Sequence, residues 1–135
     1  MTASAGFVVR HGLWAEAEAA RAAELPRLIE REHVHLIRVA WADTHGAIRA
    51  KALTAAGFAE ALHNGYNINV ATSTLDASGG RVFASFTRGG GLGLDELTGS
   101  PNLVYVPGPL SFRILPWPPG VGWILADASF RAGRP

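Results

Sequence analysis

The sequence predicts an α+β domain in which a helix packs across one face of a β-sheet. Three features predict this class: a helical segment near the start, a β-hairpin followed by a second amphipathic helix, and several short strands after it. The chain has 135 residues, the length of one domain. Because 48% of the residues are apolar and 17% are charged, we expect a globular chain with a core of its own.

The first part of the chain predicts a helix after a loose start. Residues 1–13 are mostly small and show no period. Residues 14–32 are rich in Ala, Glu, Arg and Leu, which favours a helix. Pro26 either kinks this helix or opens a second short helix at its first position. One apolar stripe should face a neighbouring element, and it consists of Leu25, Leu28 and Ile29.

A hairpin and a second helix follow. Residues 33–43 alternate, and both faces are apolar in the middle, as in a strand covered on both sides. The "DTHG" of 43–46 is typical of a turn, and 47–53 runs back as the second strand. Thr54 can cap a helix that Gly65 ends. The apolar side of this helix should lie on the sheet, and it consists of Phe58, Ala61 and Leu62.

The second half of the chain predicts further strands. Residues 66–76 and 81–87 have strand composition and are separated by a Ser-Gly-Gly turn. Residues 88–102 form a flexible loop of glycines and acids. Five prolines divide 102–127, and because proline removes a donor from a strand ladder, they should mark the ends of three short strands.

Composition excludes several classes of function. The net charge is +1, and no basic cluster is longer than two residues, so neither nucleic acid nor an anionic membrane is expected as a partner. There is no cysteine, which excludes disulfides, thiolate catalysis and zinc–thiolate sites. No secretory signal and no apolar run of membrane-spanning length is visible, so we expect a cytoplasmic protein.

Two motifs that suggest a ligand have simpler interpretations. The glycine run at 88–93 is followed by Leu and acids, without the Gly-Lys-Ser/Thr of a phosphate loop. His33 and His35 would share a strand face, yet no third metal ligand is placed near them. His45 is expected to be a solvated side chain in its turn. We therefore predict no metal site in this chain.

The carboxylates and tryptophans also have simple structural interpretations. Asp43 and Asp127 flank strands, where turn and capping roles suffice, whereas Asp76, Asp95 and Glu96 stand on or beside loops that a ligand can reach. The tryptophans predicted to lie in strands should fill a core or a subunit contact, and these are Trp41, Trp117 and Trp123. The residues alone therefore predict an α+β domain without a self-contained active site.

Two stretches nevertheless resemble a known family. "HLIRVAWADTHGAIRAKAL" (35–53), followed by an amphipathic helix, is similar to the opening hairpin of the N-terminal β-grasp domain of glutamine synthetases. "PNLVYVPGPLSFRILPWPPGVGWILAD" (101–127) is similar to the closing strands of that domain, and its Phe-Arg-Ile-Leu-Pro-Trp is the most specific part. The resemblance implies an N-terminal extension with a helix over 1–32, a β-grasp domain with a mixed sheet over 33–130, and the start of a linker to a catalytic domain over 131–135.

The resemblance also implies an activity for the complete protein. Such enzymes join ammonia to the γ-carboxyl group of glutamate with ATP and a divalent metal, Mg²⁺ or Mn²⁺. The ligands for ATP and metal come from a large C-terminal domain, so none is expected in this chain. Neighbouring subunits form a ring-shaped homo-oligomer, in which the N-terminal domain is a lid over the next subunit's active site.

Two departures from the family bear on the substrate. Family members carry Asp-Gly-Ser-Ser after the helix, where this chain reads "INVATSTLDAS" (68–78), and a second family aspartate corresponds to Asn102. Because a site for ammonium needs carboxylate charge in place of water, losing both acids should weaken it. The chain is closest to the ligases that attach amines or polyamines to glutamate.

Three residues are candidates for the gate to the substrate, and two alternative interpretations stay open. The gate candidates are Asp76, Asp95 and Asn102, because either aspartate can stand in for a missing carboxylate. The first alternative is a stand-alone β-grasp module that joins the rings of a full-length relative and regulates them without catalysis. The second is an unrelated α+β scaffold.

Overall fold

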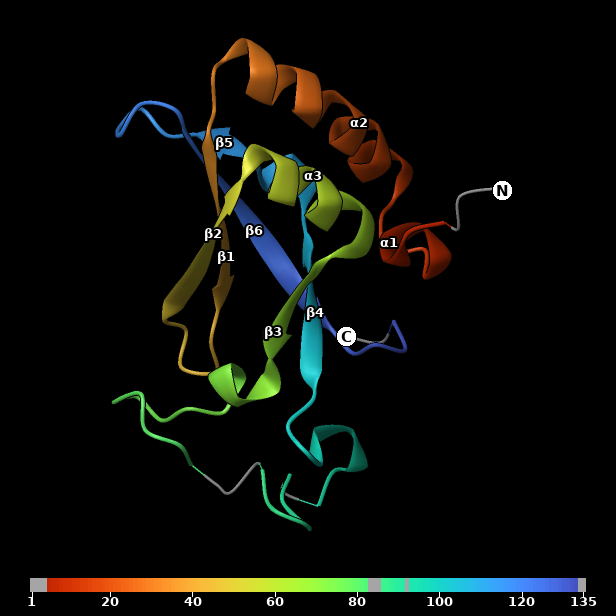
Figure 1. The fold of residues 1–135 in the computed structure, drawn as a ribbon, viewed down its shortest axis with the longest axis vertical. Coiled ribbons are helices and arrows are strands. Elements are labelled where there is room, and N and C mark those ends of the chain that lie inside the picture. Colours follow the sequence, from red (N-terminus) through yellow and green to blue (C-terminus); the bar gives the residue numbers. More distant parts are fainter. Residues whose placement is uncertain (1–4, 83–85, 92, 134–135) are drawn as a thin grey trace.

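The structure is a computed structural model that describes residues 5–82, 86–91 and 93–133. The α-helices of this part are α1 (Phe7–Arg10), α2 (Glu16–Arg31) and α3 (Ala55–Asn64), shown in Figure 1. The strands are β1 (Leu36–Ala42), β2 (Ile48–Thr54), β3 (Tyr66–Asn69), β4 (Asn102–Pro107), β5 (Arg113–Ile114) and β6 (Val121–Ser129). Short 3-10 helices lie between them, and these are η1 (Val70–Ser73), η2 (Asp95–Leu97) and η3 (Pro109–Ser111).

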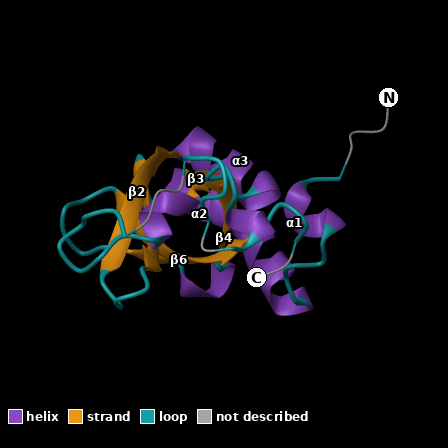
Figure 2. Ribbon diagram, turned by 90° about the horizontal axis from the view of Figure 1, so that it is seen from below, coloured by secondary structure: helices purple, strands orange, loops and turns teal. Residues whose placement is uncertain are grey.

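The strands form one mixed sheet in the order β2-β1-β6-β4-β3, with β5 paired to β6 beside this series. β1 and β6 are parallel, and the other paired strands are antiparallel. Figure 2 shows the strands following a curve rather than a plane. α3 contacts β1, β2 and β4 across one face. The α+β class, the mixed β-grasp-like sheet and the preceding helix are therefore confirmed.

The hairpin and α3 form where the sequence predicts them. β1 and β2 pair from Leu36 with Thr54 to Ala42 with Ile48. The Thr54 hydroxyl accepts a hydrogen bond from the Gly57 N–H at 3.1 Å, which satisfies one of the free donors at the start of α3. Gly65 follows the helix with φ at 67°, a conformation that glycine adopts without strain.

α2 is one continuous helix with Pro26 inside it, so the alternative of two helices is wrong. At its start, the Ala15 N–H donates to Glu18 Oε2 at 3.0 Å, as in the return bond of a capping box. Leu25 and Ile29 are buried in the same core as the sheet, and Leu28 is half-buried. The predicted stripe thus faces the core.

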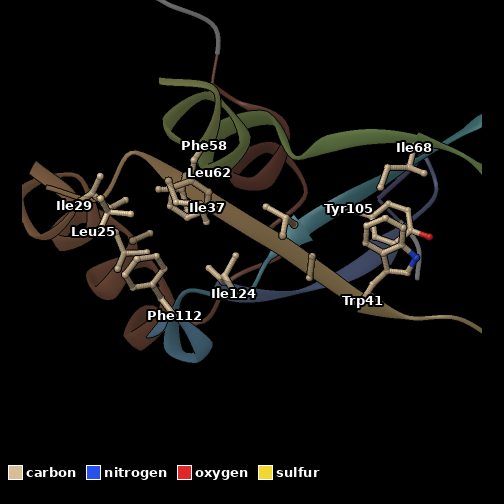
Figure 3. Close-up of a cluster of buried hydrophobic side chains, with 14 of the residues drawn as sticks. Leu25, Ile29, Ile37, Trp41, Phe58, Leu62, Ile68, Tyr105, Phe112 and Ile124 are labelled. Carbon is tan, nitrogen blue, oxygen red and sulfur yellow. The ribbon is translucent and has the colours of Figure 1, made fainter. Parts of the chain in front are cut away.

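The core lies between the sheet and the two longer helices. In Figure 3, Leu25 and Ile29 of α2 lie near Phe58 and Leu62 of α3, while Phe112 approaches from η3. Phe58 and Phe112 stack with their ring centroids 6.1 Å apart. The Phe-Arg-Ile-Leu-Pro-Trp motif thus contributes a core side chain at its first position.

The prediction of a loose start over 1–13 is wrong for the described part. Residues 1–4 lie outside the described residues, but α1 follows directly. Phe7 and Val8 are buried against Val104 and Val106 of β4, and the Phe7 N–H donates to Asn64 Oδ1 at 3.1 Å. The reason is that one face of β4 is apolar and is shielded from water by α1. The small residues of 1–13 do not reveal this long-range contact.

The strand predicted over 66–76 forms only in its first part, as β3, and the strand predicted over 81–87 is not present in the described residues. β3 ends at Asn69, and η1 follows over Val70–Ser73. Arg81 makes a single bridge to Leu75, and the described residues near it add no strand, while 83–85 lie outside the described residues. Strand composition produces a strand only where a partner edge is available. The predicted loop over 88–102 is largely irregular, with η2 inside it.

The prediction that the first strand is covered on both sides also needs correction. Only one face of β1 is fully covered: Ile37, Val39 and Trp41 point into the core, whereas Arg38 on the other face is exposed, although Ala40 beside it is buried. The reason is that the helices cover one side of this part of the sheet.

The tryptophans take three different positions. Trp41 is buried in β1, and Trp123 of β6 is half-buried. Trp117 lies between β5 and β6 and is 76% exposed, so its predicted place in a strand is wrong. The prolines around it prevent ladder pairing at that point. Among the described residues, no helix has the length and hydropathy needed to cross a membrane.

Candidate functional site

The strongest candidate site lies where β6 changes its pairing partner. Residues 121–125 pair in parallel with β1, whereas 126–129 pair with the antiparallel β4. β1 therefore separates from β6 beyond Ala40. A hollow of about 390 Å³ opens there between the end of β1, η1, β4 and β6. In Figure 1 this is the lower end of the sheet, opposite α2 and α3.

Two aromatic side chains form one wall of this hollow. The rings of Trp41 and Tyr105 meet with centroids 4.7 Å apart at 51°. The Tyr105 hydroxyl and the Ser73 hydroxyl are 2.8 Å apart and share a hydrogen bond, which ties η1 to the sheet. The floor is formed by the small side chains of Ala126 and Ala128, so the space is left open rather than filled.

Asp43 fixes the turn beside the hollow. Its Oδ1 accepts the N–H groups of His45 and Ala47, each at 2.9 Å, and its Oδ2 accepts Arg49 Nε at 2.9 Å. Its side chain is 4% exposed. Burial by itself raises the pKa of Asp43, but the Arg49 hydrogen bond, the two backbone N–H groups and the Arg49 charge together hold it below its usual value. The predicted turn role of this aspartate agrees with these contacts.

η1 is held by a local polar network. Asn69 Oδ1 accepts the Ala71 N–H at 2.9 Å and the Ser100 hydroxyl at 2.8 Å, while Asn69 Nδ2 donates to the Ser100 carbonyl at 2.7 Å. Ser100 is buried. The segment that follows β3 is therefore fixed by amides and hydroxyls, without a carboxylate.

Asp76 lies near this end of the sheet in a tight turn of its own. Its Oδ1 accepts the Ser78 hydroxyl at 2.7 Å, the Gly80 N–H at 2.8 Å and the Ser78 N–H at 2.9 Å. These bonds, with the positive charge of His45, hold the pKa of Asp76 below its usual value despite some desolvation. His45 Nε2 lies 3.0 Å from the Leu75 carbonyl, so His45 is exposed but is not simply solvated.

The other two gate candidates lie farther along the chain. Asp95 is the first residue of η2, and Asn102 begins β4 opposite Asn69. Both are exposed. In the part of the chain that the structure describes, no hydrogen bond or ion pair joins any two of Asp76, Asp95 and Asn102.

The histidine pair does not share a strand. His33 has a φ of 52° just after α2, and β1 begins only at Leu36. The predicted common strand face is therefore wrong, because the chain reverses at His33 before it enters the sheet. Across the described ranges, no three His, Asp or Glu side chains gather where they could hold a metal ion.

Sequence reasoning missed the hollow itself. The sequence predicts a core or subunit contact for Trp41, and it predicts no role for Tyr105 or Ser73. These residues are far apart in the sequence and meet only because β6 pairs with both β1 and β4. The one local signal was a large aromatic residue directly before a turn, and this signal is weak.

Comparisons with known proteins show one curated relative and similar solved structures. No protein-family model matches the sequence. Gamma-glutamylanilide synthase of Acinetobacter sp is 35% identical over 138 residues, which covers 100% of this chain and 28% of that protein. A solved structure described as a GmaS/ADP complex in conformation 1 is 26% identical with a TM-score of 0.61, covering 82% of this chain and 21% of that chain. The structure of apo GmaS without ligand is 27% identical with a TM-score of 0.59, covering 82% of this chain and 22% of that one.

The chain thus spans less than a third of the length of the curated relative that it matches. The match extends over the whole chain, and the shared fold is seen in two solved structures. The chain is therefore homologous over its whole length to gamma-glutamylanilide synthase, a ligase of glutamine synthetase type, and corresponds to the N-terminal domain of that enzyme.

Proposed function

We propose that the complete protein is a cytoplasmic γ-glutamyl-amine ligase, which joins glutamate to an organic amine in preference to ammonia. In this proposal the chain is a lid over the active site of a neighbouring subunit in a ring-shaped homo-oligomer, and 131–135 begin the linker to the catalytic domain. The relative from Acinetobacter sp supports the substrate class, because its name describes an anilide product.

The single observation that carries the proposal is that η1 contains no charged residue. Val70–Ser73 follow β3 where the family resemblance places Asp-Gly-Ser-Ser, and Asn102 stands where it places a second aspartate. An ammonium ion must exchange its water shell for negative charge, and amides and hydroxyls supply little of it. An amine with an apolar substituent gains from burial of that substituent and depends less on charge.

The three gate candidates differ in how well they can contact a substrate. Asp76 Oδ1 already accepts three hydrogen bonds within its own turn, so it is poorly placed to serve a substrate. Asp95 and Asn102 are exposed and remain candidates for contact with a substrate or a neighbouring subunit. In this proposal, ATP and Mg²⁺ or Mn²⁺ are bound by residues of the catalytic domain.

The test is to express the longest reading frame that contains this chain. The purified product is incubated with glutamate, ATP and Mg²⁺ or Mn²⁺, together with ammonia, aniline or a polyamine, and the γ-glutamyl amide is measured by mass spectrometry. We expect kcat/KM for at least one organic amine to exceed that for ammonia by tenfold or more. If the expressed protein has its highest kcat/KM with ammonia, the proposed preference for organic amines is wrong. If the 135-residue chain alone hydrolyses ATP, the proposed lid role is wrong.

A further inference from the structure

The indole N–H of Trp41 is a buried donor without an acceptor. Trp41 is 6% exposed, and its Nε1 has no hydrogen-bond partner among the described residues. Trp14 behaves differently, because its Nε1 donates to the Pro107 carbonyl at 3.0 Å. Buried N–H groups are almost always paired, since a lost bond to water is not otherwise replaced. The Trp41 donor therefore points to an acceptor that the described residues do not supply.

The unpaired donor belongs to the wall of the hollow between β1 and β4. Figure 3 shows the indole nitrogen of Trp41 and the hydroxyl of Tyr105 at the same end of their two rings. That hydroxyl bonds to Ser73, which also lines the hollow. A volume of about 390 Å³ is within the range of small-molecule sites, which are typically apolar with a few polar groups.

The lining defines what kind of molecule fits. The walls are the two aromatic rings and Leu103, and the floor is two alanines, which suits a flat apolar body. Asp43 is neutralised by Arg49, and Asp127 is an exposed residue that water screens. The hollow therefore has no buried net charge to hold an ion, and its unused polar group is a donor.

We propose that this hollow binds a neutral, flat aromatic molecule that carries a carbonyl oxygen, and that the Trp41 indole N–H donates to this oxygen. Water does not reach the N–H in the structure, so the proposal requires that the atoms covering the N–H move when the molecule binds. The site needs only residues of this chain, so the inference does not depend on the proposed ligase activity.

The test uses the ¹⁵N-labelled 135-residue chain and acetanilide, which is neutral, flat and carries one amide carbonyl. The four indole N–H signals are assigned by the signal lost in each Trp→Phe variant. We expect millimolar acetanilide to shift the Trp41 signal downfield in a saturable way, while the Trp14 signal stays in place. Propylbenzene, which has no acceptor, and benzoate, which is charged, should bind more weakly.

Matched variants separate the hydrogen bond from packing. W41F keeps an aromatic ring and removes the donor, and we expect it to weaken acetanilide binding about two- to tenfold, the effect of one neutral hydrogen bond. W123F, on β6 and outside the hollow, should leave binding unchanged. If W41F does not fold, an intermolecular NOE between the Trp41 indole proton and the acetanilide methyl group in the unmodified chain decides the question.

Three outcomes overturn the proposal. The first is a Trp41 indole signal that does not shift at the highest soluble concentration of acetanilide. The second is an affinity for propylbenzene equal to that for acetanilide, which would show that the Trp41 N–H does not contribute to binding. The third is an equal loss of affinity in W41F and W123F. None of these outcomes bears on the ligase assay of the complete protein.

Discussion

Gly122 of β6 lies directly against the ring of Phe112, and replacing it with alanine tests how tightly the family-like motif is packed. A Cβ added at Gly122 would lie 2.9 Å from Cε2 and Cζ of Phe112 and 3.5 Å from Cγ1 of Ile37. Phe112 is 2% exposed and stacks on Phe58, so its ring has nowhere to move. Overpacking of a core of this kind costs about 1–3 kcal/mol. We therefore expect Gly122→Ala to lower Tm by about 3–15 °C.

The assay is urea unfolding followed by tryptophan fluorescence, with Phe112→Leu as the second half of a double-mutant cycle. Leucine removes the ring atoms that meet the new Cβ. We expect Gly122→Ala to cost at least about 1 kcal/mol less in the Phe112→Leu background than in the unmodified chain. Gly57→Ala is the matched control, because its Cβ meets Thr54 Oγ1 at 3.4 Å, an ordinary contact. In a helix this change should stabilise the chain by up to about 1 kcal/mol.

Two results would refute this reasoning. If Gly122→Ala leaves the free energy of unfolding unchanged, the β6 backbone does not approach the Phe112 ring as described. If Gly122→Ala costs the same in both backgrounds, the cost does not come from the ring. A loss of stability in Gly57→Ala as large as that in Gly122→Ala would show a general intolerance of alanine instead.

Three further predictions concern caps, the N-terminal segment and pH. Thr54→Ala should cost about 1 kcal/mol in urea unfolding because the bond to the Gly57 N–H is lost, whereas Thr54→Ser should retain most of it. Val8→Ala should cost about 1–3 kcal/mol because Val8 is 1% exposed, and a loss below about 0.5 kcal/mol would mean that α1 does not pack on β4. Because its folded pKa is lowered, Asp43 contributes stability above its unfolded pKa of about 3.9 that is lost as pH falls through the folded value. Tm should therefore fall in acid below about pH 5, and Asp43→Asn should show a shallower fall, while an equal slope in both proteins would count against the Arg49 pairing.

Local chemistry explains which parts of the fold could be predicted. The Asp43–Gly46 turn, the Thr54 cap and the Gly65 stop each depend on contacts within four residues, and all three form. The prolines after Asn102 mark strand ends because a missing donor acts at the residue itself. The family resemblance added the mixed sheet, since residues shared with a family carry information about its long-range pairing.

Long-range pairing explains the errors. The composition of 66–76 favours a strand, yet the chain leaves the sheet after Asn69, where its side chain turns to Ser100. The small residues of 1–13 have no period and predict a loose start. Phe7 and Val8 form part of a helix because they cover Val104 and Val106 of β4, which a local pattern does not show.

The sequence by itself determined the hairpin turn, the helix caps, the helices α2 and α3 with the strands that follow α2, and the resemblance to a family of ligases. Only the tertiary structure decided that α1 covers β4, that Trp117 stays exposed while Trp41 is buried, and that Trp41, Tyr105 and Ser73 line one hollow. The physical reason is that caps and turns are set by hydrogen bonds between near neighbours in the chain. The hollow instead arises because β1 pairs only with the first part of β6, while β4 pairs with the other side of β6 farther along, and no local pattern of residues records these pairings.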